Sequence, residues 1–175
     1  ADAATHDCSS PGLGGYCHGL WWQIPLTPRA VRWLHITVLE LIATGFNAII
    51  LEPYLAHYER VHFLSDALAT PYTLSQSTER SAMLIEAHRA LLCSVRFQRI
   101  AERASIQHLF GSCNALSDAV SRNNMQTFRR LCVQLGVSPT RLHVGPTSEP
   151  ALILERLILF AEQRGRPIRV PPPRP

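Results

Sequence analysis

The most strongly patterned stretch of the chain runs from Leu34 to about Leu55, where apolar residues recur at helical spacing. At 3.6 residues per turn they cover one face completely and most of the opposite side. Between these faces runs a narrow polar strip formed by Thr37, Glu40, Thr44 and Asn47. Glu40 is the only charge in the middle of this stretch, whereas a solvated face usually carries several. The pattern predicts a long, mostly buried helix with one isolated acid.

Short apolar runs bounded by turn residues predict strands on both sides of this helix. The predicted strands lie around Asp2 and over residues 14–19, 20–26, 61–65 and 104–110. The second and third form a meander that turns near Gly19. The strand over 61–65 ends directly at Asp66, and the last one stops at Gly111. Strands that alternate with helices predict an α/β domain.

Further helices are predicted from their periodicity and their start signals. They cover residues 67–74, 78–94, 116–135 and 148 to about 163, with Gly136 as the C-cap of the third. We predict a domain over residues 1–136, a linker over 137–147, a C-terminal helix over 148–165 and a proline- and arginine-rich tail over 166–175. The C-terminal helix either packs on the core or begins a further module.

Composition favours one globular domain, because 46% of the 175 residues are hydrophobic and 17% are charged. No apolar run is expected to reach the length of a membrane span, so we expect no membrane partner. The chain starts without a Met, and we expect it to be a piece of something longer. Five cysteines without a Cys-x-x-Cys pair indicate a reducing compartment, so we expect an intracellular protein, cytoplasmic or nuclear.

The chain is basic, with a net charge of +4, and all 17 basic residues are arginine. The planar guanidinium binds two phosphate oxygens at once, so this composition suits a nucleic-acid partner. A GC-rich coding sequence would give the same bias. Both explanations stay open at this point.

Acidic residues are few, and several lie at the edges of predicted elements. The four aspartates are Asp2, Asp7, Asp66 and Asp118, and Glu40 lies on the polar strip. If the sheet places these elements side by side, four acids converge. Two carboxylates ~4 Å apart repel by about 4 kcal/mol at an effective dielectric constant of 20, so divalent cations would be needed between them. Oxygen ligands alone favour Mg²⁺ or Mn²⁺.

This order of strands, helices and acids resembles the ribonuclease H family in its retroelement reverse-transcriptase form. Residues 114–122 resemble the Asn-x-x-Ala-Asp-x-Leu-Ser-Arg signature of retrotransposon ribonuclease H domains, with Ser117 in place of Ala and Val120 in place of Leu. Residues 35–41 resemble the helix that delivers the family's glutamate, and Asp2 with the following glycines resembles its first hairpin. Within the family, the chain is most similar to elements that integrate with a tyrosine recombinase.

The resemblance implies a ribonuclease H-like α/β fold with a mixed five-stranded sheet, the first three strands antiparallel and the others parallel, flanked by helices. It also implies an enzyme, an endoribonuclease that hydrolyses the RNA strand of RNA–DNA hybrids during reverse transcription. Asp2, Glu40, Asp66 and Asp118 would hold two Mg²⁺ or Mn²⁺ ions, and His108 would assist catalysis. The long first hairpin loop leaves Asp7 as an alternative to Asp2.

The expected partners are an RNA–DNA hybrid and the polymerase domain of the same polyprotein. The residues expected to contact nucleic acid are Asn114, Arg122, Arg129 and Arg130. Two alternatives stay open: a catalytically silent ribonuclease H-like module that only holds nucleic acid, and a structural interaction module of a larger particle. Each acid also has a purely structural interpretation, for example Asp118 as a first-turn acid stabilised by the helix dipole.

Overall fold

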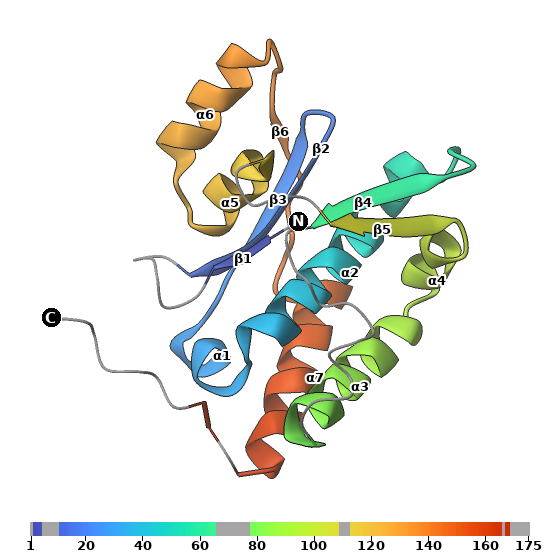
Figure 1. The fold of residues 1–175 in the computed structure, drawn as a ribbon, viewed down its shortest axis with the longest axis vertical. Helices are drawn as coiled ribbons and strands as arrows, with labels where there is room; N and C mark the ends of the chain where they lie inside the picture. Colours follow the sequence, from blue (N-terminus) through green and yellow to red (C-terminus); the bar gives the residue numbers. More distant parts are fainter. Residues whose placement is uncertain (1, 5–10, 66–77, 109–112, 166, 169–175) are drawn as a thin grey trace, which may run out of the picture.

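The computed structural model of the protein describes residues 2–4, 11–65, 78–108, 113–165 and 167–168. Helices and strands alternate along these residues, which confirms the predicted α/β class (Figure 1). The strands are β1 (Asp2–Ala4), β2 (Gly12–Cys17), β3 (Leu20–Pro25), β4 (Val61–Ser65), β5 (Ala104–His108) and β6 (Thr140–Arg141). The helices are α1 (Pro28–Trp33), α2 (Ile36–Leu55), α3 (Thr78–Leu92), α4 (Val95–Ala101), α5 (Ala115–Ser121), α6 (Met125–Gln134) and α7 (Glu149–Gln163).

The strands form two sheets. Strands β1, β2 and β3 are antiparallel neighbours, and β6 adds to the free edge of β3 in parallel orientation. Strands β4 and β5 form a separate parallel pair. The prediction of a single five-stranded sheet is therefore wrong for the described residues. The described part of β1 is only three residues long and pairs with Gly12–Gly14, so it is too short to join β2 to β4 along their lengths.

The connection between β2 and β3 is a two-residue turn, at the position that the sequence predicts. His18 and Gly19 both have positive φ, 45° and 85°, as a type I′ hairpin turn requires. This turn matches the twist of the flanking strands and pairs Cys17 with Leu20. The meander is confirmed.

Helix α2 lies at the centre of the core, as its pattern predicts. The Asn47 end of its polar strip faces the sheet: Asn47 is 6% exposed, and its Oδ1 accepts a hydrogen bond of 2.8 Å from the indole Nε1 of buried Trp22. By length and composition alone, Ile36–Leu55 would be able to cross a membrane, and 61% of that stretch is buried inside the protein. Burial of this kind is typical of a core helix that is apolar around most of its circumference.

Two successive glycines of β2, Gly14 and Gly15, allow one helix to approach each face of the sheet. A Cβ at Gly15 would overlap the side chains of Asn47 on α2 and Trp22. A Cβ at Gly14 would lie 2.7 Å from the backbone nitrogen of Ser121 on α5. Because successive strand residues point to opposite faces, α2 and α5 lie on opposite sides of the sheet. Helices α2, α3 and α7 lie together on one side in Figure 1, and α5 and α6 on the other.

We expect Gly14→Ala to destabilise the protein by about 1–3 kcal/mol, because the new methyl group would force α5 away from β2. The obstacle is the backbone of Ser121 and Cγ1 of Val120, at 2.7 and 2.8 Å, and a buried backbone cannot move aside cheaply. Urea denaturation measures the loss. Gly145→Ala is the matched control, because its nearest contact is His143 Nε2 at 3.8 Å, and it should change stability by less than about 1 kcal/mol. Equal stability of the two variants would contradict the close approach of α5.

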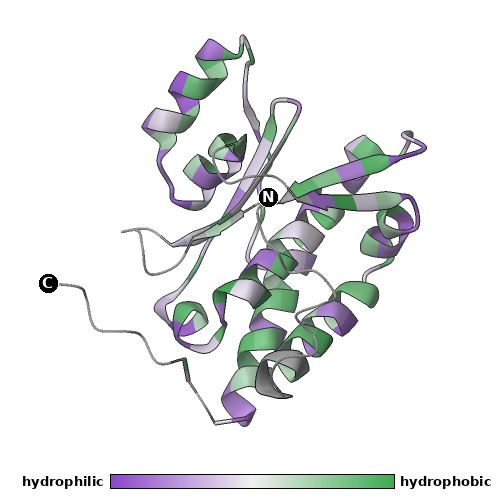
Figure 2. Ribbon diagram, in the orientation of Figure 1, coloured by the Kyte–Doolittle hydropathy of each residue, from purple (hydrophilic) through white to green (hydrophobic). Residues whose placement is uncertain are grey.

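Helix α7 packs against α1, α2 and α3. Its buried residues Ile153, Leu154, Leu157, Ile158 and Ala161 belong to the same core cluster as those of α2. Glu86 of α3, only 6% exposed, accepts hydrogen bonds of 3.1 and 2.7 Å from Nε and Nη2 of Arg156. Figure 2 shows apolar residues along α2, α3 and α7 where these helices meet. The domain boundary at residue 136 stays a prediction.

Several predicted elements have different bounds in the structure. The helix predicted over 116–135 is split into α5 and α6, because Asn123 has a φ of 55° and the Oδ1 of Asn124 caps α6 by accepting from the backbone N–H of Thr127. The predicted linker contains β6. Gly136 follows α6 with a φ of 65°, as predicted for a C-cap. The helix predicted over 67–74 lies outside the described residues.

Candidate functional site

The structure describes the side chains of two of the four predicted metal ligands, Glu40 and Asp118. Asp2 is described through its backbone, which lies in β1 opposite Gly14. Asp66 and the alternative ligand Asp7 lie outside the described residues. His108 ends β5, where its backbone pairs with that of Ser65, and its side chain lies outside the described part.

Glu40 lies on the polar strip of α2 whose other end, at Asn47, contacts the sheet. It precedes Asn47 by seven residues, which is two helical turns, so the two residues share a face of the helix. Between them, Thr44 is 9% exposed and its hydroxyl donates to the backbone carbonyl of Glu40 over 3.1 Å. Glu40 is half-buried. Glutamate side chains are mostly exposed, so a half-buried one on a core helix is unusual.

Asp118 lies on α5, which is fixed to the sheet by its own buried residues. Val120 and Ser121 are fully buried against β2. The Asp118 side chain is 40% exposed, and its Oδ1 accepts a hydrogen bond of 2.6 Å from Arg122 Nε. Within the described part of the chain, the second oxygen, Oδ2, has no hydrogen-bond partner. The carboxylate therefore keeps an accessible oxygen of the kind that a hard cation binds.

Helices α2 and α5 both contact β1, the strand of Asp2, and both also contact its neighbour β2. The carboxylates of Glu40 and Asp118 are therefore carried by helices that approach the strand of Asp2 from opposite faces. Among the described residues, no three His, Cys, Asp or Glu side chains lie together in a way that could hold a metal ion. The predicted cluster of four acids stays a prediction, because it depends on Asp66 and on the side chain of Asp2.

The start of α5 is buried. Asn114 occupies the N-cap position without a capping hydrogen bond from its side chain, and it is 6% exposed, while Ser117 is 5% exposed. Both line a cavity of about 390 Å³ between the two sheets, together with residues of β2, β4 and α2. Cys17 lies in the same cavity, and burial raises the pKa of its thiol. The contact of Asn114 with nucleic acid stays a prediction.

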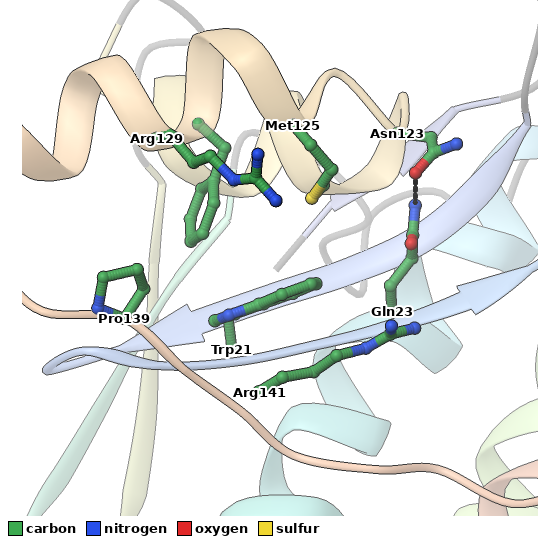
Figure 3. Close-up of a pocket in the computed structure, with 8 residues that line it drawn as sticks. Trp21, Gln23, Asn123, Met125, Arg129, Pro139 and Arg141 are labelled. Carbon is green, nitrogen blue, oxygen red and sulfur yellow. Dashed lines mark hydrogen bonds between the residues drawn. The ribbon is translucent and has the colours of Figure 1, made fainter.

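A second cavity, of about 450 Å³, lies where α6 and β6 meet the outer face of β3 (Figure 3). We call it the arginine–tryptophan pocket. Its lining residues are Trp21, Gln23, Asn123, Met125, Phe128, Arg129, Pro139 and Arg141. The guanidinium of Arg141 lies over the Trp21 ring, 5.1 Å from its centroid, and Trp21 also contacts Phe128 at 5.3 Å between ring centroids.

Sequence patterns predict only one member of this pocket, Arg129. The alternation of β3 could have indicated Trp21, because Trp22 is fully buried and its neighbour must point to the other face. Arg141 gives no such signal, because it lies in a segment predicted as a linker. Arg130 is exposed and does not line the pocket.

Comparisons of the chain with protein-family models, curated proteins and solved structures gave no match.

Proposed function

We propose that the protein is a ribonuclease H-type endoribonuclease of a retroelement reverse transcriptase, which hydrolyses the RNA strand of RNA–DNA hybrids. The observation that carries this proposal is the arrangement of α2 and α5. The two helices that carry Glu40 and Asp118 approach β1, the strand of Asp2, from opposite faces of one sheet. The resemblance implies a sheet flanked by helices, and helices on both faces of one sheet agree with it.

The order of elements along the chain supports the same proposal. An antiparallel meander comes first, followed by a long core helix with one acid on its inner strip, a parallel strand pair and a short helix with Asp118. Strand β4 ends at Ser65, directly before Asp66. The ribonuclease H-like fold is thus a proposal that rests on this order, although the described strands form two sheets.

The donor set suits Mg²⁺ or Mn²⁺, because it consists of carboxylates and the described Asp118 keeps an open oxygen. Asp2, Glu40, Asp66 and Asp118 would hold the ions. Bound divalent cations would supply activation of the attacking water and stabilisation of the leaving oxygen. Arg122 holds one oxygen of Asp118, and the carboxylate side chain is 40% exposed.

A catalytically silent nucleic-acid-binding module is the second candidate. The 2.6 Å ion pair between Asp118 and Arg122 favours it, because an arginine that holds one carboxylate oxygen competes with a cation for it. The two functions make opposite predictions for hydrolysis and the same prediction for binding. Intracellular location and association with a polymerase domain are part of the first proposal.

Cleavage of a labelled RNA–DNA hybrid in the presence of Mg²⁺ tests the proposal. We expect the wild-type chain to cut the RNA strand of the hybrid, to leave the same RNA uncut as a single strand, and to stop cutting when EDTA removes the cation. Hybrid binding without cleavage in either Mg²⁺ or Mn²⁺ would instead support the silent module. Cleavage that persists in EDTA would contradict a metal-dependent site.

A further inference from the structure

We propose that the arginine–tryptophan pocket is a second nucleic-acid contact, which binds the sugar-phosphate backbone of one strand beside the helix that carries Asp118. The proposal rests on the proposed function only in that the same nucleic acid is the ligand. It assigns nucleic-acid binding to Arg141 and Trp21, for which the resemblance implies no role. It also places Arg129 in the same binding site.

The charge of the pocket favours an anionic ligand. Arg129 and Arg141 both line the pocket, and its lining residues include no Asp or Glu. Among the described residues, neither arginine makes an ion pair. Five other arginines, namely Arg29, Arg89, Arg99, Arg122 and Arg156, are paired with carboxylates. Two unpaired guanidiniums at one cavity are suited to phosphate oxygens.

The apolar part of the pocket favours a nucleic acid over a simple anion. Trp21 lies between Arg129 and Arg141 in the view of Figure 3, and Met125 lies above it. An aromatic ring beside arginines suits the alternation of base or sugar with phosphate along a strand. Arg141 already covers the indole at 5.1 Å, so a bound strand would either stack on the guanidinium plane or displace it.

The pocket is built on fixed elements rather than on isolated surface chains. The backbone N–H groups of Thr140 and Leu142 donate to the carbonyls of Gly19 and Trp21, each over 2.7 Å, and so fix Arg141 beside β3. On the other side, Nε2 of Gln23 donates to the carbonyl of Val120 over 2.7 Å. A site with little freedom to lose binds a ligand at a lower entropic cost.

The same hydrogen bond places the pocket at the end of α5. Gln23 also donates to Oδ1 of Asn123 over 3.4 Å, and Asn123 follows Asp118 by five residues. Helix α5 ends at Ser121, two residues before Asn123, and the helical part from Asp118 to Ser121 rises only ~4.5 Å, which is little more than one nucleotide step of a strand. A strand held in the pocket can therefore continue toward Asp118.

Binding measurements without cleavage test this inference. Fluorescein-labelled single-stranded DNA and an RNA–DNA hybrid are titrated in EDTA over a series of salt concentrations. The variants are the double substitution Arg129→Ala/Arg141→Ala, the charge-conserving Arg129→Lys/Arg141→Lys, and the control Arg164→Ala. Arg164 is a matched control, because its guanidinium also lies over an aromatic ring, at 5.7 Å from Phe160, but outside the pocket.

We expect the alanine pair to weaken hybrid binding at least about tenfold at low salt and to reduce the slope of log K against log salt by roughly 1.5–2. The lysine pair should keep most of the slope but bind with lower affinity. Lysine keeps the positive charge and lacks the planar guanidinium that binds two phosphate oxygens at once. Retained binding by the lysine pair shows that both positions tolerate substitution without loss of the fold. Arg164→Ala should bind like the wild type. Equal affinity and equal slope for the wild type and the alanine pair would overturn the inference.

The outcome is separable from that of the proposed function. If hybrid cleavage depends on Asp118 while the alanine pair binds like the wild type, the pocket inference fails and the hydrolase stands. If Asp118→Asn changes no activity while the alanine pair loses affinity and salt dependence, the pocket inference stands and the hydrolase fails.

Discussion

Replacing Asp118 by asparagine is expected to reduce Mg²⁺-dependent cleavage of an RNA–DNA hybrid by at least about 100-fold. The substitution removes a negative charge and leaves a weaker metal ligand of the same shape. The fold should survive, because the side chains of Asp118 and Arg122 are 40% and 36% exposed, and an exposed pair of this kind contributes less than about 1 kcal/mol. Initial rates on labelled hybrid and urea denaturation of the same preparation give both quantities.

Glu155→Gln is the matched control for Asp118→Asn. Glu155 is also an exposed acid with an arginine partner, Arg29, at 2.6 Å, but it lies on α7, away from β1. The same loss of charge there should leave cleavage within about twofold. If Asp118→Asn cleaves as fast as Glu155→Gln, Asp118 is a structural first-turn acid and the hydrolase proposal fails.

Trp22→Ala is expected to cost about 3–5 kcal/mol of unfolding free energy, the largest stability effect that we predict. Trp22 is fully buried in the core between β3 and α2, and its indole Nε1 donates to Asn47 over 2.8 Å. The substitution therefore opens a cavity and leaves a buried amide oxygen without its donor. Thermal and urea unfolding measure the loss.

Two companion variants separate packing from hydrogen bonding at Trp22. Trp22→Phe keeps most of the volume and removes the donor to Asn47, so it should cost about 1–3 kcal/mol. Trp33→Ala removes a tryptophan that is only partly buried at the edge of the same core, and it should cost less than Trp22→Ala. Equal losses for Trp22→Ala and Trp33→Ala would show that the contact between β3 and α2 is not a main support of the fold.

Local patterns predict the elements that build the core. The spacing of apolar residues in α2, the turn at His18–Gly19 and the strand ending at Ser65 can all be inferred, because each depends on neighbouring residues only. The polar strip of α2 is predicted, but its direction is not. Only the partner Trp22, 25 residues away, makes Asn47 an inward-facing residue.

Pairings between distant segments account for what the sequence does not predict. The division into two sheets depends on which distant strands pair, since β1 pairs with β2 and β4 pairs with β5. Strand β6 depends on the backbone groups of Gly19 and Trp21, and no pattern within Thr140–Arg141 indicates it. The break between α5 and α6 has a local cause in Asn123 and Asn124. Because apolar residues continue at helical spacing across these two asparagines, the sequence predicts one helix instead of two. The arginine–tryptophan pocket is lined by residues of β3, α6 and β6, which are far apart in the sequence.

The structure also explains why the residues of the signature lie where they do. Val120 and Ser121 are buried against glycines of β2, so they set the distance between α5 and the sheet. Asp118 and Arg122 face outward on the same helix and form an ion pair. One short helix thus combines a packing face with a face that can carry chemistry, which the proposed function requires.

Binding of Mn²⁺ tests most directly whether Glu40 and Asp118 belong to one metal site. We expect calorimetric titration to show Mn²⁺ binding by the wild type, and a reduction in affinity of at least about tenfold for both Glu40→Gln and Asp118→Asn. Glu155→Gln should bind like the wild type. Mn²⁺ binding that is unchanged in Glu40→Gln and Asp118→Asn, or absent from the wild type, would contradict a shared carboxylate site.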